Sequence, residues 1–393
     1  MKLSDRIRRG MARIYLRYVS VVFCLAAGVA LFLKPPRESA GKRLLVLKPD
    51  AVGDYILFRN FMKLLRAGEK YRDYEIVFCG NSACRDFALH YDSAYADEFV
   101  WIDKNRIYLD IFYYIRFARS MYRRFSVTIQ PVRSRELLFD FIVRISGSGE
   151  RIAPEGDTVN ILHGYKKMSD RWYTRLIPSG DQFSFEFDAN RQFFELLLDQ
   201  PVLFRRPFLE KDHRDDTGIP GLPQRFIALF PGAQLPFRRW KTRNFAAVCR
   251  DLGEKYGMDT VILGSGSDRE LAGEIVRFSG GRLMDLTGRT RLHQLPEIIA
   301  RSRMVITNDS MAAHLGAALD IPTVVISQMN HYGRFVPYPE ELKVKMICVI
   351  PESFQRTGSH ELTEKFRYGS EVDINLITVN QVSNAIAELH LIH

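Results

Sequence analysis

Short apolar runs alternate with loops and with helical patterns from residue 41 onward. The run RLLVLK at 43–48 predicts a strand, PDAVGD at 49–54 a loop, and apolar residues at helical spacing over 55–67 a helix that ends at Gly68. The same pattern continues downstream, with strands expected at 75–79, 98–102 and 126–130 and a helix at 135–145. Alternation of this kind predicts a parallel sheet that helices cover on both faces.

A second series of the same kind begins after residue 225. The run FIALF at 226–230 predicts a strand, 231–241 a loop, and the following residues a helix that Thr242 caps and Gly257 ends. Further strands are expected at 260–263, 304–307 and 323–327, and further helices at 268–278, 292–300 and 311–319. The pattern therefore predicts an α/β protein with two tandem Rossmann-like, doubly wound domains.

The stretch between the two series, residues 199–224, is rich in Pro, Asp and Arg and has no sustained period, which is typical of a linker. We expect four segments: a basic arm with an apolar helix at 1–40, an N-terminal domain at 41–200, a linker at 201–224 and a C-terminal domain at 225–393.

Residues 19–33 form an apolar run in which Ser20 is the one clearly polar side chain, and six basic residues and one acid precede it within residues 1–17. A helix of this length measures about 22 Å, less than the ~30 Å hydrocarbon core of a bilayer. Three interpretations stay open: an anchor that lies on or enters a membrane, a buried terminal helix, and a cleaved signal peptide.

Composition narrows the class of protein further. The chain has 393 residues, 46% of them hydrophobic, and a net charge of +10, which excludes a disordered or fibrous protein. Its five cysteines form no C-x-x-C and have no histidine at metal-ligand spacing, so neither a disulfide framework nor a zinc site is expected and a reduced cytoplasm is the default compartment. Basic residues are not interleaved with aromatics, so no nucleic-acid partner is expected.

Doubly wound sheets bind ligands beyond the carboxyl ends of their strands, so the loops at 49–54, 231–241, 264–268 and 307–311 are the candidate sites. The strongest is the turn from strand to helix near Ser310, because free N–H groups and the helix dipole there favour a phosphate. His314 follows by one helical turn and lies on the same face. The alternative is that Asp309 is a helix N-cap and His314 an interior histidine.

Two further loops carry candidate chemistry. Arg238 and Arg239 can hydrogen-bond a diphosphate, and Gly232 allows the backbone to approach it; the alternative is a solvated basic turn with Trp240 in the core. Asp54, at the mouth of the first strand, is either a helix N-cap or a carboxylate that takes a proton from a bound hydroxyl. The Gly-Ser-Gly at 264–266 is a weak signal that favours a plain turn.

Five blocks, in this order, resemble glycosyltransferase family nine, the family of ADP-heptose:lipopolysaccharide heptosyltransferases and their relatives. The resemblance extends from about residue 43 to 390 and includes RIAPEGDTVNILHGY and FEFDANRQFFELL in the middle of the chain. The five blocks are VLKPDAVGDYIL, FPGAQLPFRRWKTRNFAAV, VILGSGSDRE, DLTGRTRLHQLPEII and ITNDSMAAHLGAALDIPTVVIS.

The resemblance implies a GT-B architecture and an inverting, metal-independent transfer of a heptose or related sugar. The donor would be a nucleotide sugar such as ADP-heptose, with no other cofactor, and the acceptor a lipid-linked cell-envelope glycan such as lipopolysaccharide core. Asp54 would be the base, with Gly53 beside it on the acceptor side, and would face the donor phosphates across a cleft. The implied donor-binding residues are Gly232, Ala233, Gln234, Arg238, Asp268, Glu270, Thr287, Gly288, Asp309, Ser310, Met311 and His314.

Two departures from the family pattern concern the donor site: Met311 replaces a glycine and Arg238 replaces a lysine. Both bear on the choice of donor sugar. The alternatives are a GT-B nucleotide-sugar enzyme of another kind, such as an epimerase, and a catalytically silent protein that binds sugar nucleotides. A lipid-linked acceptor implies the cytoplasmic face of the inner (plasma) membrane, with residues 19–33 lying on or dipping into its inner leaflet.

Overall fold

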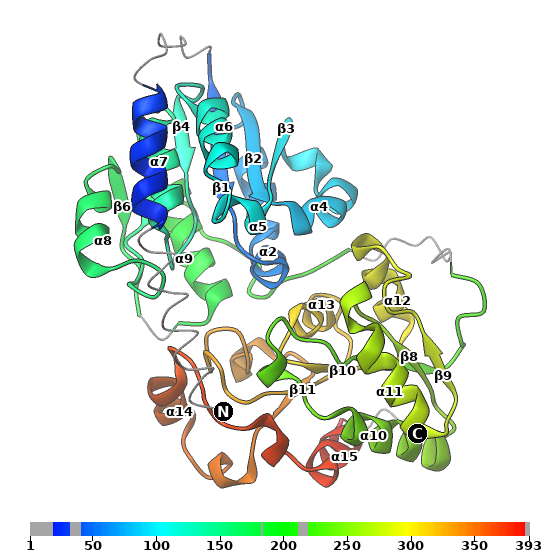
Figure 1. The fold of residues 1–393 in the computed structure, drawn as a ribbon. Coiled ribbons are helices and arrows are strands. Elements are labelled where there is room, and N and C mark those ends of the chain that lie inside the picture. Colours follow the sequence, from blue (N-terminus) through cyan, green and yellow to red (C-terminus); the bar gives the residue numbers. More distant parts are fainter. Residues whose placement is uncertain (1–18, 32–40, 182–183, 211–218, 390–393) are drawn as a thin grey trace. The chain divides into compact units, whose positions relative to one another are not determined.

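The computed structural model describes residues 19–31, 41–181, 184–210 and 219–389. The chain divides into two compact units, one with residues up to 182 and 188–203, the other with residues 183–187 and 204 onward. Each unit is built around one sheet with helices against its faces (Figure 1). The sequence expectations for residues 1–18 and for the end of the apolar run, residues 32 and 33, lie outside the described residues.

The first unit contains a six-stranded sheet in the order β3-β2-β1-β4-β5-β6. All neighbouring strands are parallel. This is the doubly wound order, and its direction reverses between β1 and β4. The strands are β1 (Arg43–Lys48), β2 (Glu75–Asn81), β3 (Glu98–Ile102), β4 (Val127–Ile129), β5 (Glu150–Pro154) and β6 (Arg175–Ile177).

The predicted single helix over 55–67 is wrong in detail, because two helices meet at Arg59. That residue is buried and forms an ion pair with Asp92, which lies after α4 in the chain. Around it the Met62 N–H bonds to the Arg59 carbonyl, three residues back. The helices of this unit are α2 (Val52–Phe58), α3 (Asn60–Ala67), α4 (Arg85–Tyr91), α5 (Lys104–Ile107), α6 (Ile111–Met121), α7 (Leu137–Ile145), α8 (His163–Asp170) and α9 (Glu186–Leu198).

The second unit repeats the same topology. Its sheet has the order β12-β11-β10-β7-β8-β9, all parallel, so the reversal falls between β7 and β10. The strands are β7 (Phe226–Phe230), β8 (Asp259–Ile262), β9 (Leu283–Asp285), β10 (Met304–Asn308), β11 (Thr323–Ile326) and β12 (Met346–Val349). The helices are α10 (Thr242–Tyr256), α11 (Arg269–Ser279), α12 (Leu295–Arg301), α13 (Met311–Ala318), α14 (Ser359–Phe366) and α15 (Val379–Glu388). The predicted pair of tandem Rossmann-like domains is confirmed.

Helix α10 shows why these segments fold as they do. Its buried residues Phe245, Val248, Cys249 and Leu252 recur at helical spacing and pack on the second sheet. The helix ends at Gly257, whose φ of 62° suits glycine. The expected cap at Thr242 is wrong, since the N-cap position is Lys241 and makes no side-chain hydrogen bond.

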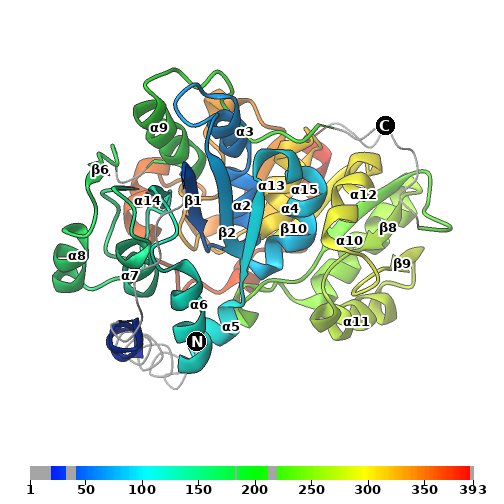
Figure 2. The same ribbon diagram turned by 90° about the horizontal axis from the view of Figure 1, so that it is seen from above.

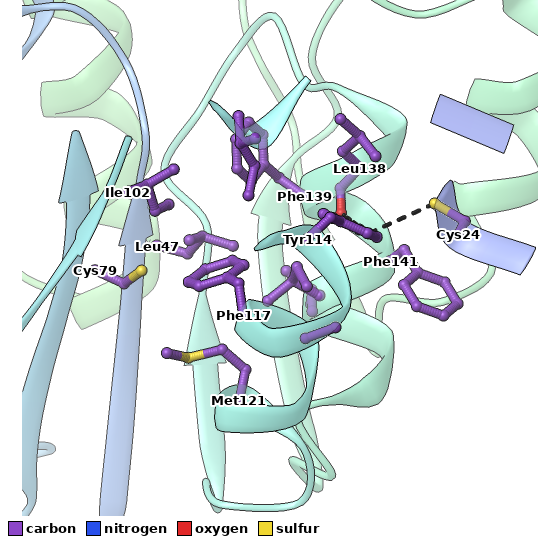
Figure 3. Packing of buried hydrophobic residues seen from close by; sticks show 14 of the residues in the cluster. Cys24, Leu47, Cys79, Ile102, Tyr114, Phe117, Met121, Leu138, Phe139 and Phe141 are labelled. Carbon is purple, nitrogen blue, oxygen red and sulfur yellow. Dashed lines mark hydrogen bonds between the residues drawn. The ribbon is translucent and has the colours of Figure 1, made fainter. Parts of the chain in front are cut away.

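The first sheet is buried on both faces, as an all-parallel sheet requires. On one face, Leu45 and Leu47 pack against residues of α6 and α7, a cluster seen in Figure 3. On the other face, Phe78 of β2 lies against Tyr55 and Phe58 of α2. The contacts on this second face hold α2, and with it the loop after β1, against the sheet.

Residues 19–31 are helical and pack against the first unit. Figures 1 and 2 show this dark-blue helix on the outer side of α6 and α7. Its Phe23, Ala27 and Leu31 are buried, whereas Val22 and Leu25 are exposed. In the described part of the chain, no helix has the length and apolar character needed to span a bilayer.

Candidate functional site

The loop after β1 leads directly into α2, and Asp54 is the third residue of that helix. Asp54 is partly exposed. The N-cap position is Ala51, so the interpretation of Asp54 as an N-cap is wrong. A carboxylate in the first turn is nevertheless favoured by the helix dipole. Gly53 precedes it in the same turn and is also partly exposed.

A buried lysine holds this loop in place. The Lys48 ammonium lies 2.9 Å from the Asp50 carboxylate and donates a 3.1 Å hydrogen bond to the Pro131 carbonyl, which follows β4. The Asn81 amide donates to the Asp50 carbonyl at 3.1 Å. The carboxyl ends of β1, β2 and β4 are thereby joined where the sheet order reverses, which is the usual ligand position in such sheets.

The carboxylates of Asp54 and Asp50 both act on the Cys84 thiol near the end of β1. Burial, followed by the charges of Asp54 and Asp50, raises the pKa of the Cys84 thiol to about 12. Cys84 is therefore a neutral thiol, and the negative charge of the site belongs to the carboxylates.

In the second unit, only glycine fits at position 232, because the Asp268 carboxylate lies where a Cβ atom would be. A Cβ atom at Gly232 would lie 2.6 Å from the Asp268 carboxylate. That carboxylate is buried and accepts hydrogen bonds from the Ser265 N–H at 2.9 Å and hydroxyl at 2.7 Å. Asp268 thus organises two loops, while Glu270, in the first turn of α11, is the exposed acid of the pair.

The loops after β8 and β9 also touch. Gly288 has a φ of 65°, and its N–H donates to the Gly264 carbonyl at 2.9 Å. A Cβ there would lie 2.7 Å from the Gly266 Cα. Thr287 is buried, with both its N–H and its hydroxyl bonded to Asp285. Gly264 and Gly266 therefore do more than form a turn, because they let the backbone of the loop after β9 pack closely against them.

The structure brings Arg238 and Asp309 together. The Arg238 Nη2 lies 2.6 Å from the Asp309 carboxylate and 3.2 Å from its carbonyl oxygen, and both side chains are largely buried. Within the described residues, Nε of Arg238 is buried without an acceptor. The guanidinium therefore keeps donor capacity beyond its bonds to Asp309.

Ser310, and not Asp309, caps α13. Its hydroxyl accepts the Ala312 N–H at 3.3 Å and lies 2.9 Å from the Thr307 hydroxyl. Met311 is the first residue of the helix and is partly exposed. The start of α13 thus lies beside the Arg238–Asp309 pair at the point where the second sheet reverses.

Asn308 was not among the sequence candidates, yet it connects the two loops. It is fully buried, its amide donates to the Pro231 carbonyl at 2.7 Å, and its oxygen accepts the Trp240 N–H at 3.2 Å. The Trp240 indole donates to the Ile377 carbonyl at 2.9 Å. Trp240 is thus in the core, as the alternative for this loop held, while Arg238 forms an ion pair with Asp309.

The remaining residues of the 231–241 loop differ in exposure. Ala233 is buried, and its carbonyl accepts a 2.9 Å hydrogen bond from Nε of Arg239. Gln234 is exposed. Of the two, Gln234 is therefore the one whose side chain is accessible to a ligand.

The structure places His314 in the interior. Its Nδ1 lies 3.0 Å from the Tyr338 hydroxyl, and burial lowers its pKa to about 4. The imidazole is neutral at pH 7 and contributes no positive charge to a phosphate.

His331, after β11, is a second residue that the sequence did not suggest. It has a φ of 56°, unusual for a non-glycine residue, and its Nδ1 lies 2.7 Å from the Arg367 carbonyl oxygen. Burial lowers its pKa; the charges of Arg334 and Arg238 lower it further, and that of Asp309 raises it. The ring therefore belongs to the surroundings of the Arg238–Asp309 pair.

Among the described residues, no group of three or more His, Cys, Asp or Glu side chains is arranged to hold a metal ion. The chemistry offered by the second unit is that of an anion site: a guanidinium, a helix N-terminus and closely approaching glycine backbones. The first unit offers a partly exposed carboxylate at the end of its central strand.

Two parallel, doubly wound domains in tandem give this α/β protein a fold of the GT-B class. Residues 186–359 match the model of glycosyltransferase family 9 (heptosyltransferase). This part of the chain is therefore similar to that family.

Similar proteins of known name are heptosyltransferases or family 9 glycosyltransferases. Lipopolysaccharide heptosyltransferase 2 of Salmonella typhimurium is 33% identical over 145 residues, or 35% of this chain. The aligned region spans 38% of that relative's length. A family 9 glycosyltransferase from Veillonella parvula superposes with a TM-score of 0.66, at 19% identity over 90% of this chain and 99% of that one. For E. coli ADP-heptose lps heptosyltransferase II the score is 0.64, at 19% identity over 88% and 98%. These two structures show that the fold is shared.

Proposed function

We propose that this protein is an inverting, metal-independent glycosyltransferase. It moves a heptose or related sugar from a nucleotide-sugar donor, such as ADP-heptose, to a lipid-linked cell-envelope glycan such as lipopolysaccharide core. The match of residues 186–359 to the family model supports the reaction type, and the matched relatives carry heptosyltransferase names. No cofactor beyond the nucleotide sugar is needed for this reaction.

The observation that carries the proposal is the Arg238–Asp309 pair at the start of α13. Glycosyl transfer to an alcohol places negative charge on a departing diphosphate. A fixed guanidinium beside a helix N-terminus stabilises that charge as it develops. Asp309 holds the guanidinium in place before the donor arrives.

Asp54 is proposed as the general base. Its carboxylate takes the proton of the acceptor hydroxyl, whose oxygen attacks the anomeric carbon of the donor sugar. The bond from that carbon to the phosphate oxygen breaks on the opposite side, and the nucleoside diphosphate leaves with the electron pair. The configuration at the anomeric carbon is inverted, and no metal takes part.

A lipid-linked acceptor places the reaction at a membrane surface. We propose that the protein associates peripherally with the cytoplasmic face of the inner membrane, since its donor is made in the cytosol. The helix at 19–31, with its exposed Val22 and Leu25, supports this association.

The test is a transfer assay with ADP-heptose and a heptose-deficient lipopolysaccharide acceptor, read by release of ADP. Asp54→Asn is expected to lower kcat at least 100-fold and leave the donor Kd unchanged, because general-base catalysis contributes about 10²–10⁴-fold. Asp73→Asn, at an exposed carboxylate of the same unit, is the matched control and should retain full activity. Wild-type turnover in Asp54→Asn would remove Asp54 from the mechanism.

A further inference from the structure

The helix at 19–31 has no charged residue, and one of its faces fits the first unit closely. The Phe23 ring lies 5.8 Å from that of Tyr114 on α6, and the Cys24 thiol is 3.9 Å from the Leu137 carbonyl oxygen. Ala27 is completely buried. Figure 3 shows Cys24 beside Tyr114, Leu138 and Phe141. This face anchors the helix to the protein.

The opposite face is apolar, and its side chains are exposed in the part of the chain that the structure describes. Val22, Leu25 and Val29 are 55%, 66% and 67% exposed, and their spacing places them on one side of the helix. A helix face that exposes three aliphatic side chains and no polar one is unfavourable in water. Such a surface indicates an interaction site.

The neighbouring helix α6, which packs on this helix through Tyr114, has an exposed side of a different composition. Phe112, at its start, is 76% exposed, and Arg116 and Arg119 follow at helical spacing on the same side. Neither arginine forms an ion pair with a carboxylate among the described residues. The outward side of α6 therefore presents one aromatic ring and two unpaired positive charges.

Basic residues also lie on the other side of the helix. Phe141 of α7 is 3.8 Å from the Cβ position of Gly28 and packs against Trp172 with a centroid distance of 6.2 Å. The Arg144 guanidinium lies over the Trp172 ring at 5.0 Å, and Arg171 beside it is exposed. Arginine and tryptophan together are typical of a lipid headgroup region.

We propose that this face docks on the surface of an anionic lipid bilayer, with the helix lying in the plane of the interface. The docking face consists of an apolar centre and a basic rim, made by Val22, Leu25, Val29, Phe112, Arg116, Arg119, Arg144 and Arg171. The apolar centre enters the acyl boundary while the rim meets lipid phosphates.

Charge favours a bilayer over a second copy of the chain. In a symmetric dimer the same patch faces itself, so the arginines of the rim would approach one another. The sequence before the helix, residues 1–17, adds a net charge of +5, which also favours an anionic surface. The inference deepens the proposed function and rests on it only for the location of the acceptor.

The apolar centre is tested by co-sedimentation of the full chain with phosphatidylethanolamine–phosphatidylglycerol vesicles. Replacing Val22, Leu25 and Val29 together by serine is expected to lower the partition coefficient by on the order of ten-fold per side chain. Val276→Ser with Leu376→Ser is the matched control, since both are exposed apolar residues of the second unit. The control should bind as the wild type does.

The basic rim is tested with two vesicle compositions. Arg116→Gln with Arg119→Gln should lower binding to the anionic vesicles about five-fold per residue and leave binding to pure phosphatidylcholine vesicles unchanged. Binding of the wild type should weaken as salt is added. Equal loss on both kinds of vesicle would show that the arginines do not meet anionic headgroups.

Equal vesicle binding by the triple serine variant and the wild type overturns the inference, once thermal unfolding shows that both are folded. So does a wild-type dimer, seen by light scattering without lipid, that the triple variant dissociates. The proposed function fails separately: a wild type that binds vesicles but transfers no sugar to a water-soluble acceptor fragment refutes the activity and leaves the docking face in place.

Discussion

Individual buried side chains determine how the loops of the second unit are arranged. Asn308 bonds to the backbone on both sides of the 231–241 loop, and Asp268 fills the space beside Gly232. Neither residue has to contact a ligand in order to affect the candidate site. Each fixes the backbone on which Arg238 and the start of α13 depend.

Gly232→Ala tests the contact with Asp268. The new Cβ would lie 2.6 Å from a carboxylate that is held by Ser265, so the loop must shift. We expect a loss of about 1–3 kcal/mol in unfolding free energy and weaker nucleotide-sugar binding, measured by urea denaturation and calorimetry. Gly273→Ala is the control, because that helical glycine has nothing within 4 Å of its Cβ position. It should stabilise the protein by up to about 1 kcal/mol.

The neutral state of His314 predicts a pH dependence of stability. Its pKa falls from 6.5 to about 4 on folding, so the unfolded chain binds the proton more tightly. The stabilisation is complete above pH 6.5 and is lost as pH falls toward 4. Between pH 7.5 and 5 the wild type should lose about 2 kcal/mol more than His314→Gln, measured by urea denaturation at each pH. Parallel curves for the two proteins would show that folding does not lower the pKa of His314.

At the scale of single elements, the N-cap of α13 has both a structural and a binding role. Ser310→Ala removes the hydroxyl that accepts the Ala312 N–H and should cost about 1 kcal/mol in stability. It should also weaken donor binding, because the cap positions the N–H groups that face an anion. Thr378→Ala removes the same kind of cap from α15 and is the control. We expect a similar loss of stability there with an unchanged donor Kd.

Elements with a strong local pattern were predictable from the sequence. The apolar spacing of α10 and the glycine at its end define that helix without reference to the rest of the chain. The break between α2 and α3 was not predictable, because it accompanies a buried ion pair between Arg59 and Asp92, which are 33 residues apart. A periodic pattern contains no information about such a partner.

The candidate site was predictable to the same extent. The motifs indicated Arg238 and Asp309 separately, but their ion pair joins residues 71 apart in the sequence. Asn308 and His331 escaped notice because their roles depend on backbone groups of other loops, and neither asparagine nor histidine in a loop is a signal by itself. Sequence motifs identified the loops, and tertiary contacts determine which residues organise them.

At the scale of the whole molecule, the chain contains one topology twice. In both sheets the order reverses beside the first strand of the unit, and Asp54 follows that strand in the first unit as Arg238 does in the second. In the proposed mechanism the first unit supplies a carboxylate and the second an anion site. The two parts of the proposed chemistry are therefore encoded in different units.

Because the two parts lie in different units, we expect a substitution in the second unit to change the donor Kd and a substitution in the first to change kcat. Arg238→Gln removes the guanidinium from the second unit and should raise the donor Kd about 30- to 150-fold, since a charge-assisted hydrogen bond contributes about 2–3 kcal/mol. The same variant leaves the Asp309 carboxylate buried without its cation, so Arg238→Gln with Asp309→Asn is needed to show that lost binding is not lost folding. The double variant should recover thermal stability but not donor affinity.

Asp54→Asn should lower kcat with the donor Kd unchanged. If both substitutions changed kcat alone, the donor phosphates would not bind at Arg238 and the second unit would need another anion site.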